Sequence, residues 1–267
     1  MSLEGKHALV TGGSRGIGRG IALALAEQGA QVAVHYYRNE DAAKHTLSGV
    51  RAGGADGLIV QADVTSPEAL QAMFAQVREA FGSLEVYVSC ARPELATFYQ
   101  PPLEITLEQW DTAMDSQAKA FLVGSQEAAR LMGPGGRIVA ITHAPSARTG
   151  SWQRWTAMGA GKSALESLCR YFAVALAPRG ITVNAVSPGL TEDSVLNGLP
   201  DELVDASRDW HASGWTPMGR LGTPADIGNV VALLCSERAS WITGQIIYAD
   251  GGASLMDTIF PLPMQVG

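Results

Sequence analysis

Short apolar runs alternate along the chain with longer segments in which apolar residues recur every three or four positions. The short runs predict strands at 6–11, 31–36, 57–61, 84–89, 136–141, 181–186 and 245–249. The periodic segments predict amphipathic helices near 16–29, 40–52, 67–81, 106–132, 155–178 and 223–236. This alternation is typical of a parallel sheet with helices on both faces. Because no repeat, low-complexity tract or linker interrupts it, we expect an α/β fold with a single domain over residues 1–267.

Three segments lack a regular pattern: 90–105, 142–154 and 188–222. Each follows the carboxyl end of a predicted strand, which is where open α/β sheets bind their ligands. These segments are therefore expected to surround the functional site.

A glycine-rich turn, Thr11–Gly18, joins the first predicted strand to the first predicted helix. Glycine permits positive φ and close approach of a ligand, and the amides at a helix start attract phosphate. The strand–turn–helix context favours a dinucleotide over a glycine turn without a ligand. The residues expected to contact it are Gly12, Ser14, Arg15, Gly16, Ile17 and Gly18.

The second strand bears on the choice of cofactor. Enzymes that use NAD carry an acidic residue there for the adenosine ribose, whereas Val34–Arg38 contains no carboxylate. Arg15 and Arg38 together suit a 2′-phosphate, which favours NADPH, with NADH as the alternative; the competing interpretation is two solvated arginines. Asp63 and Val64 are candidates for the adenine, although Asp63 also suits a helix cap before Pro67 or a turn.

Charge and composition limit the possible partners. A net charge of −7 and a pI near 5.2 argue against nucleic acid and anionic membranes. The three cysteines, Cys90, Cys169 and Cys235, have no ligand spacing, so we expect free thiols and no metal site. The N-terminus lacks a signal-peptide core, and no stretch reaches the roughly 18 apolar residues of a membrane span. We expect a soluble, cytoplasmic protein.

The glycine turn, the segment Val183–Gly189 and the stretch Thr243–Gly252 together resemble the short-chain dehydrogenase/reductase family over about residues 5–255. The resemblance implies a doubly wound Rossmann domain with seven parallel strands, bound NAD(P)H, and hydride exchange with a carbonyl or alcohol. It also implies a homodimer or homotetramer built on the helices at 106–132 and 155–178, and a substrate lid over about 190–222. Further cofactor contacts are then expected from Ala91, Thr142, Lys162, Pro188, Gly189 and Thr191, the last near the nicotinamide amide.

The catalytic pattern departs from that family, which uses Asn, Ser, Tyr and Lys. Lys162 is at its expected position, but Met158 stands where the tyrosine is expected and Trp155 at the position used by some enoyl reductases. Neither side chain supplies a usable proton. Gln117 occupies the asparagine position and His143 that of the serine.

Two residues are candidate replacements. Ser146 is the first choice as carbonyl partner, with an ordinary loop serine as the alternative. His143 is a candidate general acid, although a packed or solvated histidine is the commoner case. The other proton sources are a bound water and a phenol on the substrate itself.

Aromatic residues indicate the substrate. Trp152, Trp155, Trp210 and Trp215, with Met158, are expected to form a flat apolar wall for a fused-ring compound, unless they pack the lid or a subunit interface. The combination resembles atypical angucyclinone ketoreductases of aromatic polyketide antibiotic pathways, which implies reduction of a ring ketone. A catalytically silent, cofactor-binding structural or sensor subunit is the alternative, and an enoyl reductase ranks below both.

Overall fold

The computed structural model describes residues 2–143, 153–193 and 195–256. Within them the chain forms a parallel seven-stranded sheet in the order β3-β2-β1-β4-β5-β6-β7. The strands are β1 (His7–Val10), β2 (Gln31–Tyr36), β3 (Gly57–Gln61), β4 (Val86–Ser89), β5 (Arg137–Ile141), β6 (Thr182–Pro188) and β7 (Ile246–Ala249). The expected doubly wound α/β fold is confirmed.

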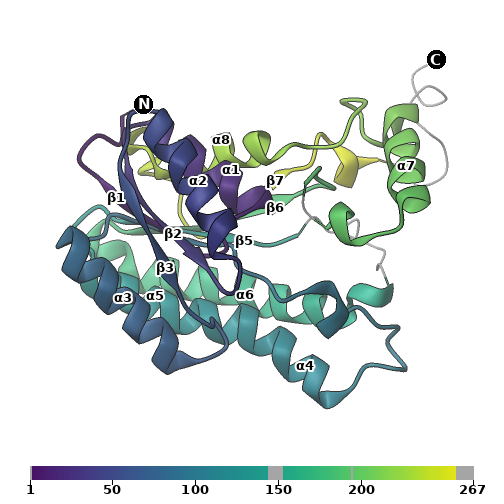
Figure 1. Cartoon of the computed structure of the whole chain (residues 1–267), viewed down its shortest axis with the longest axis horizontal. Coiled ribbons are helices and arrows are strands. Elements are labelled where there is room, and N and C mark those ends of the chain that lie inside the picture. The colour runs from purple at the N-terminus through teal and green to yellow at the C-terminus, as the bar shows by residue number, and fades with distance from the viewer. Residues whose placement is uncertain (1, 144–152, 194, 257–267) are drawn as a thin grey trace.

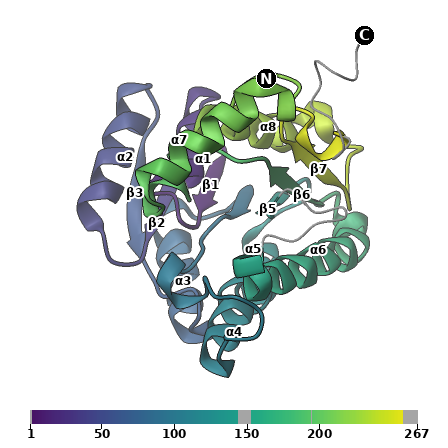
Figure 2. The same cartoon turned by 90° about the vertical axis from the view of Figure 1, so that its right-hand side faces the viewer.

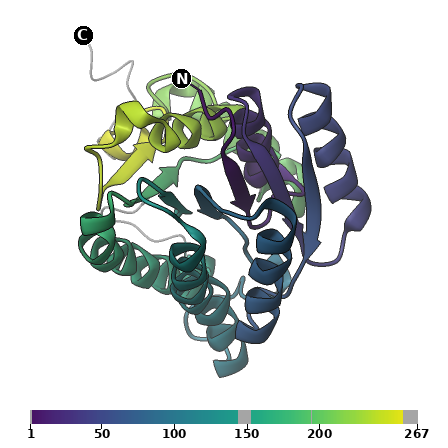
Figure 3. The ribbon, with the colours of Figure 1, turned by 90° about the vertical axis from the view of Figure 1, so that its left-hand side faces the viewer.

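Helices cover both faces of the sheet (Figure 1). The helices are α1 (Gly16–Glu27), α2 (Glu40–Ala52), α3 (Pro67–Phe81), α4 (Leu107–Met114), α5 (Ala120–Leu131), α6 (Thr156–Leu176), α7 (Asp201–Trp210) and α8 (Pro224–Cys235). One core lies between the sheet and α1, α2 and α8, and includes Ile21, Leu47 and Val231. A second core, with Phe74 and Leu165, lies under α3, α5 and α6. Figure 3 shows the helices on the two faces of the sheet from the left-hand side of Figure 1.

The direction in which successive strands are added to the sheet reverses between β1 and β4. Strand β1 pairs with β2 on one side and with β4 on the other, so Val10 lies between Val34 and Val88. The chain builds outward in opposite directions from this point, and the turns after β1 and β4 diverge. Such a switch point leaves a crevice at the carboxyl ends of the strands.

The predicted helix at 106–132 is interrupted. Its periodicity continues throughout, but the chain forms α4, then a π-helical turn at Asp115–Lys119, then α5. π-turns inside helices often occur at functional sites. This one brings Gln117 beside Ala91, in the turn that follows the central strand β4.

The segment after β6 is the one in which the sequence predicts a substrate lid, and we call it the lid segment. It contains α7 and a turn at His211–Trp215, in which Gly214 has a φ of 106°. Figure 2 shows α7 at the end of the molecule beyond the carboxyl ends of the strands. Arg208 on α7 forms two hydrogen bonds of 2.9 Å with the carboxylate of Glu192, and this ion pair ties the lid helix to the chain leaving β6.

Among the described residues, none of the helices is both long and apolar enough to cross a bilayer. The same residues contain no cluster of three His, Cys, Asp or Glu side chains with metal-binding geometry. Cys90, Cys169 and Cys235 are free thiols, as expected.

Candidate active site

A cleft of about 2480 Å³ runs along the carboxyl ends of the central strands. The glycine turn and the turn after β4 form one side, the start of α6 another, and the lid segment the third. It contains every residue expected at the cofactor: Gly12, Ser14, Arg15, Gly16, Ile17, Gly18, Arg38, Asp63, Val64, Ala91, Thr142, Lys162, Pro188, Gly189 and Thr191. The structure therefore gathers these dispersed positions into one site.

The glycine turn is shaped for close contact. Gly12 has a φ of +69°, and a Cβ there would lie 2.9 Å from the Cα of Ala91. A Cβ on Gly18 would lie 2.1 Å from the Gly12 carbonyl oxygen. Only glycine fits these two positions, because a side chain would push the turn away from the start of α1.

The start of α1 differs from those of α2, α3, α4 and α8. Those helices are capped by the side chains of Asn39, Ser66, Thr106 and Thr223, respectively. In the described structure, no side chain caps α1 at Arg15, and its first turn carries no acidic residue. Its free amide groups face the cleft and fit a diphosphate.

His35, which the sequence analysis did not select, holds the glycine turn. It is buried at the end of β2, and its Nδ1 accepts a 2.9 Å hydrogen bond from the Gly12 amide. Its Nε2 lies 3.1 Å from the carbonyl oxygen of Ala62. Because Nδ1 must accept, the ring is the neutral tautomer with the proton on Nε2. Burial lowers the pKa of His35 to about 4, consistent with this uncharged state.

The adenosine end of the cleft carries two arginines. Arg15 is exposed, and the Arg38 guanidinium stacks over the Tyr37 ring at 4.7 Å. Arg38 also lies 3.9 Å from the Glu94 carboxylate. Asp63 accepts hydrogen bonds from the amide and hydroxyl of Thr65, so it closes a turn. The expectation that Asp63 caps the helix at Pro67 is wrong, because the Ser66 hydroxyl performs that role.

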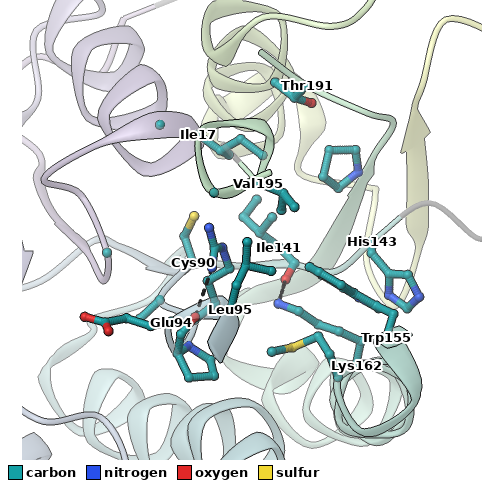
Figure 4. A pocket seen from close by; sticks show the side chains of 18 of the residues that line it. Ile17, Cys90, Glu94, Leu95, Ile141, His143, Trp155, Lys162, Thr191 and Val195 are labelled. Atoms are coloured by element: carbon teal, nitrogen blue, oxygen red, sulfur yellow. Dashed lines mark hydrogen bonds between the residues drawn. The ribbon is translucent and has the colours of Figure 1, made fainter. Parts of the chain in front are cut away.

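Lys162 lies at the opposite end, on the second turn of α6. It is buried, and its Nζ donates a hydrogen bond to the Ile141 carbonyl oxygen at the end of β5 (Figure 4). Burial lowers its pKa to about 8. Thr191 lies across the pocket and is also buried; its hydroxyl donates to the Gly189 carbonyl oxygen at 2.8 Å.

Hydroxyl and amide groups beside Lys162 have structural partners. The Thr142 hydroxyl donates to Glu166 at 2.6 Å. The Gln117 amide donates to the Ala91 carbonyl oxygen at 3.2 Å, so it supports the turn after β4. Neither group is free to act on a substrate oxygen without breaking its bond.

His143 is half-buried at the end of β5. Its Nδ1 is enclosed and has no hydrogen-bond partner among the described residues. Burial, together with the nearby charge of Lys162, lowers the pKa of His143 to about 4. The imidazole is therefore neutral near pH 7, and it is a poor source of a proton.

The aromatic wall is only partly as expected. Trp210 and Trp215 stack with ring centroids 4.7 Å apart, and both line the cleft from the lid side. Trp155 lines it from the α6 side and meets Phe98 edge to face at 5.0 Å. Met158 is fully buried in that same cluster at the bottom of the cleft. Ser146 and Trp152 lie outside the described residues.

The comparisons with known proteins agree with this geometry. Residues 12–254 match the family model described as "Enoyl-(Acyl carrier protein) reductase". Versicolorin reductase 1 of Aspergillus parasiticus is 35% identical over 262 residues, which cover 94% of this chain and 97% of that protein. The 1-cyclohexenylcarbonyl-CoA reductase of Streptomyces collinus is 36% identical over 255 residues, covering 93% and 87%, respectively.

Solved structures show the same fold. The angucycline C-6 ketoreductase LanV with bound NADP has a TM-score of 0.85 and 36% identity, covering 96% of this chain and 98% of that one. The reductase LugOII, which catalyses keto-reduction during lugdunomycin biosynthesis, has a TM-score of 0.86 and 35% identity, covering 96% and 100%. The fold and the cleft define a nucleotide-dependent oxidoreductase. The chain belongs to the short-chain dehydrogenase/reductase family and is an NAD(P)H-dependent oxidoreductase.

Proposed function

We propose that this protein is an NADPH-dependent ketoreductase that reduces a ring ketone of a polycyclic, phenolic aromatic polyketide in antibiotic biosynthesis. The observation that carries the proposal is the single cleft that joins the glycine turn and Lys162 to the stacked Trp210 and Trp215. Such a broad aromatic cavity suits a flat fused-ring ligand. The similarity to LanV and to versicolorin reductase supports a polyketide ketone as substrate.

The cofactor residues have distinct roles in this proposal. The uncapped start of α1 and the glycine turn hold the diphosphate, while Arg15 and Arg38 hold the 2′-phosphate. Lys162 and Thr191 flank the nicotinamide half. When bound, the cofactor supplies the hydride, and the protein supplies placement.

The proton comes from the substrate. Among the described candidates, His143 is neutral, the Thr142 hydroxyl is bonded to Glu166, and Lys162 is bonded to Ile141. A phenol beside the ketone already bonds the carbonyl oxygen and transfers its proton as charge develops there. General acid catalysis contributes about 10²–10⁴-fold. Correct placement contributes up to ~7–11 kcal/mol, so it outweighs a missing protein acid.

One experiment compares a phenolic polycyclic ketone with its methyl ether, which lacks the neighbouring proton. NADPH oxidation is expected to fall roughly 100-fold or more in kcat/KM with the ether. The double variant His143→Ala, Ser146→Ala is expected to keep most of the activity. Near-total loss in that variant would remove substrate assistance as the main account.

Two other functions have specific support. The relative that reduces a cyclohexenylcarbonyl-CoA, and the family description, favour an enoyl reductase. Product analysis separates the two, because carbonyl reduction yields an alcohol and enoyl reduction a saturated ketone or thioester. Tight NADPH binding without turnover of any aromatic ketone would favour the silent, cofactor-binding subunit.

We also infer a homodimer or homotetramer. Tyr171 and Val174 on α6 expose 75% and 78% of their area in the single chain, which is unusual for large apolar groups on neighbouring turns. Light scattering during size-exclusion chromatography tests this, and a monomeric mass contradicts it.

A further inference from the structure

Arg92 is a charged residue at the centre of the cleft with no assigned role. It follows β4 in the turn whose Cys90 and Ala91 amides are bonded to the Thr11 hydroxyl, at 3.0 and 3.3 Å. Pro93 comes next, and a proline restricts the residue before it to extended backbone. The Arg92 backbone is therefore held in place, and its side chain lines the cleft.

The guanidinium of Arg92 is desolvated without an opposite charge bonded to it. Its Nη1 donates a 3.0 Å hydrogen bond to the Pro93 carbonyl oxygen. Among the described residues, no carboxylate lies within ion-pair distance of Arg92, and the nearby Glu94 is instead 3.9 Å from Arg38. Burial lowers the pKa of Arg92, and the charge of Arg15 lowers it further. A half-buried cation without a bonded carboxylate is costly unless an anion reaches it.

The neighbouring charges locate that anion. Arg15, at the adenosine end, and Lys162, at the nicotinamide end, both lie close enough to Arg92 to interact with it electrostatically. The position between them corresponds to the middle of a dinucleotide, where the two linked phosphates lie. The planar guanidinium fork matches phosphate oxygens and binds them through two parallel bonds.

We propose that Arg92 is a ligand of the cofactor diphosphate and acts from the β4 side, opposite the amides at the start of α1. This inference rests on the proposed cofactor site. It adds a cationic side chain where the diphosphate otherwise meets backbone amides and the helix terminus. Arg92 thus sets affinity for both nicotinamide dinucleotides, whereas Arg15 and Arg38 discriminate between them.

The test measures dissociation constants for NADPH and NADH by tryptophan fluorescence, without any ketone. The proteins are wild type, Arg92→Met, Arg92→Lys, Arg38→Met and the surface control Arg51→Met, whose arginine pairs with Asp56. Arg92→Met is expected to weaken NADPH and NADH by the same factor, roughly 10- to 100-fold, because a charge-assisted bidentate contact is lost. Arg92→Lys is expected to recover part of this affinity. Arg38→Met should weaken the binding of NADPH but not that of NADH. Arg51→Met should change neither dissociation constant.

Melting temperatures separate ligand binding from a structural role. Because Arg92 is a half-buried charge with no carboxylate bonded to it, Arg92→Met is expected to leave the melting temperature of the free protein unchanged or higher. The increase in melting temperature that saturating NADPH produces should be smaller in Arg92→Met than in the wild-type protein. A lower melting temperature of the free variant with unchanged dissociation constants would assign Arg92 a structural role and overturn the proposal.

The remaining outcomes are also decisive. Unchanged NADPH and NADH affinity with a raised KM for the ketone would assign Arg92 to the substrate and overturn the inference, leaving the proposed function intact. A loss restricted to NADPH would place Arg92 at the 2′-phosphate and overturn it as well. If the wild-type protein binds neither dinucleotide, the cofactor site and the inference both fail.

Discussion

His35 offers a test of how the glycine turn is held in its binding shape. Its Nδ1 accepts from the Gly12 amide, and its Nε2 donates to the Ala62 carbonyl oxygen. The amide of asparagine reaches the position of the histidine Nδ1, and that of glutamine reaches the position of Nε2. His35→Asn therefore keeps the bond to Gly12, and His35→Gln keeps the bond to Ala62.

The two variants separate the effect of the Gly12 bond on NADPH binding from the effect of the Ala62 bond on stability. A buried amide left without its acceptor costs about 1–3 kcal/mol, so His35→Gln is expected to weaken NADPH binding by roughly 5- to 100-fold. His35→Asn is expected to bind NADPH nearly as wild type, while losing about 1 kcal/mol of stability with the Ala62 bond. Calorimetry gives the dissociation constant, and urea unfolding gives the stability. Equal NADPH affinity in both variants would refute the role of His35 in holding Gly12.

The protonation of His35 adds a pH dependence. Its pKa in the folded protein, about 4, lies below the ordinary value of 6.5, because burial disfavours the charged ring. The stability that the neutral His35 contributes is therefore fully present above pH 6.5 and is lost as the pH falls from 6.5 towards 4. Part of that loss should disappear in His35→Asn, which does not titrate, and a stability curve identical to the wild-type curve would contradict this.

Three further predictions concern the cleft. Glu192→Gln removes the ion pair with Arg208. Because a partly exposed pair contributes little, KM for the ketone should rise only up to about fivefold, with little change in kcat. An unchanged KM, measured by NADPH oxidation, would show that the pair does not hold the lid closed. Tyr99→Phe removes a tyrosine hydroxyl from the cleft lining. Its kcat should stay within about twofold of the wild-type value, because substrate-assisted protonation needs no protein acid. A loss of kcat in the roughly 10²–10⁴-fold range of general acids would make Tyr99 the proton donor. With a Lys162 pKa of about 8, kcat/KM should fall as the pH rises through 8 and the ammonium deprotonates, and Lys162→Arg should remove that limb from the pH profile.

Most of the fold was predictable because each element has a local cause. The strands at 31–36 and 57–61 and the helices at 40–52 and 67–81 have the predicted bounds, since apolar runs and side-chain caps define them. The break of 106–132 into α4 and α5 was not predictable, because its apolar periodicity does not change. The π-helical turn contains Gln117, which bonds the Ala91 carbonyl oxygen, a contact between distant parts of the chain.

The site was less predictable than the fold. His35 was missed because a polar residue at the end of a strand usually faces solvent. The available signal was its position between Val34 and Tyr36 in a strand buried on both faces, where both ring nitrogens need partners. Arg92 was missed because Arg15 and Lys162, the charges beside it, are distant from it in the sequence.

The parallel indoles of Trp210 and Trp215 give the lid an optical signature. Two rings stacked at 4.7 Å with planes 17° apart couple their electronic transitions, so the pair should produce a far-ultraviolet dichroism couplet that single tryptophans lack. A ligand that inserts between the rings or swings one away would abolish the couplet. Following the couplet in stopped flow therefore tests, without any attached dye, whether the lid segment moves when ligands bind.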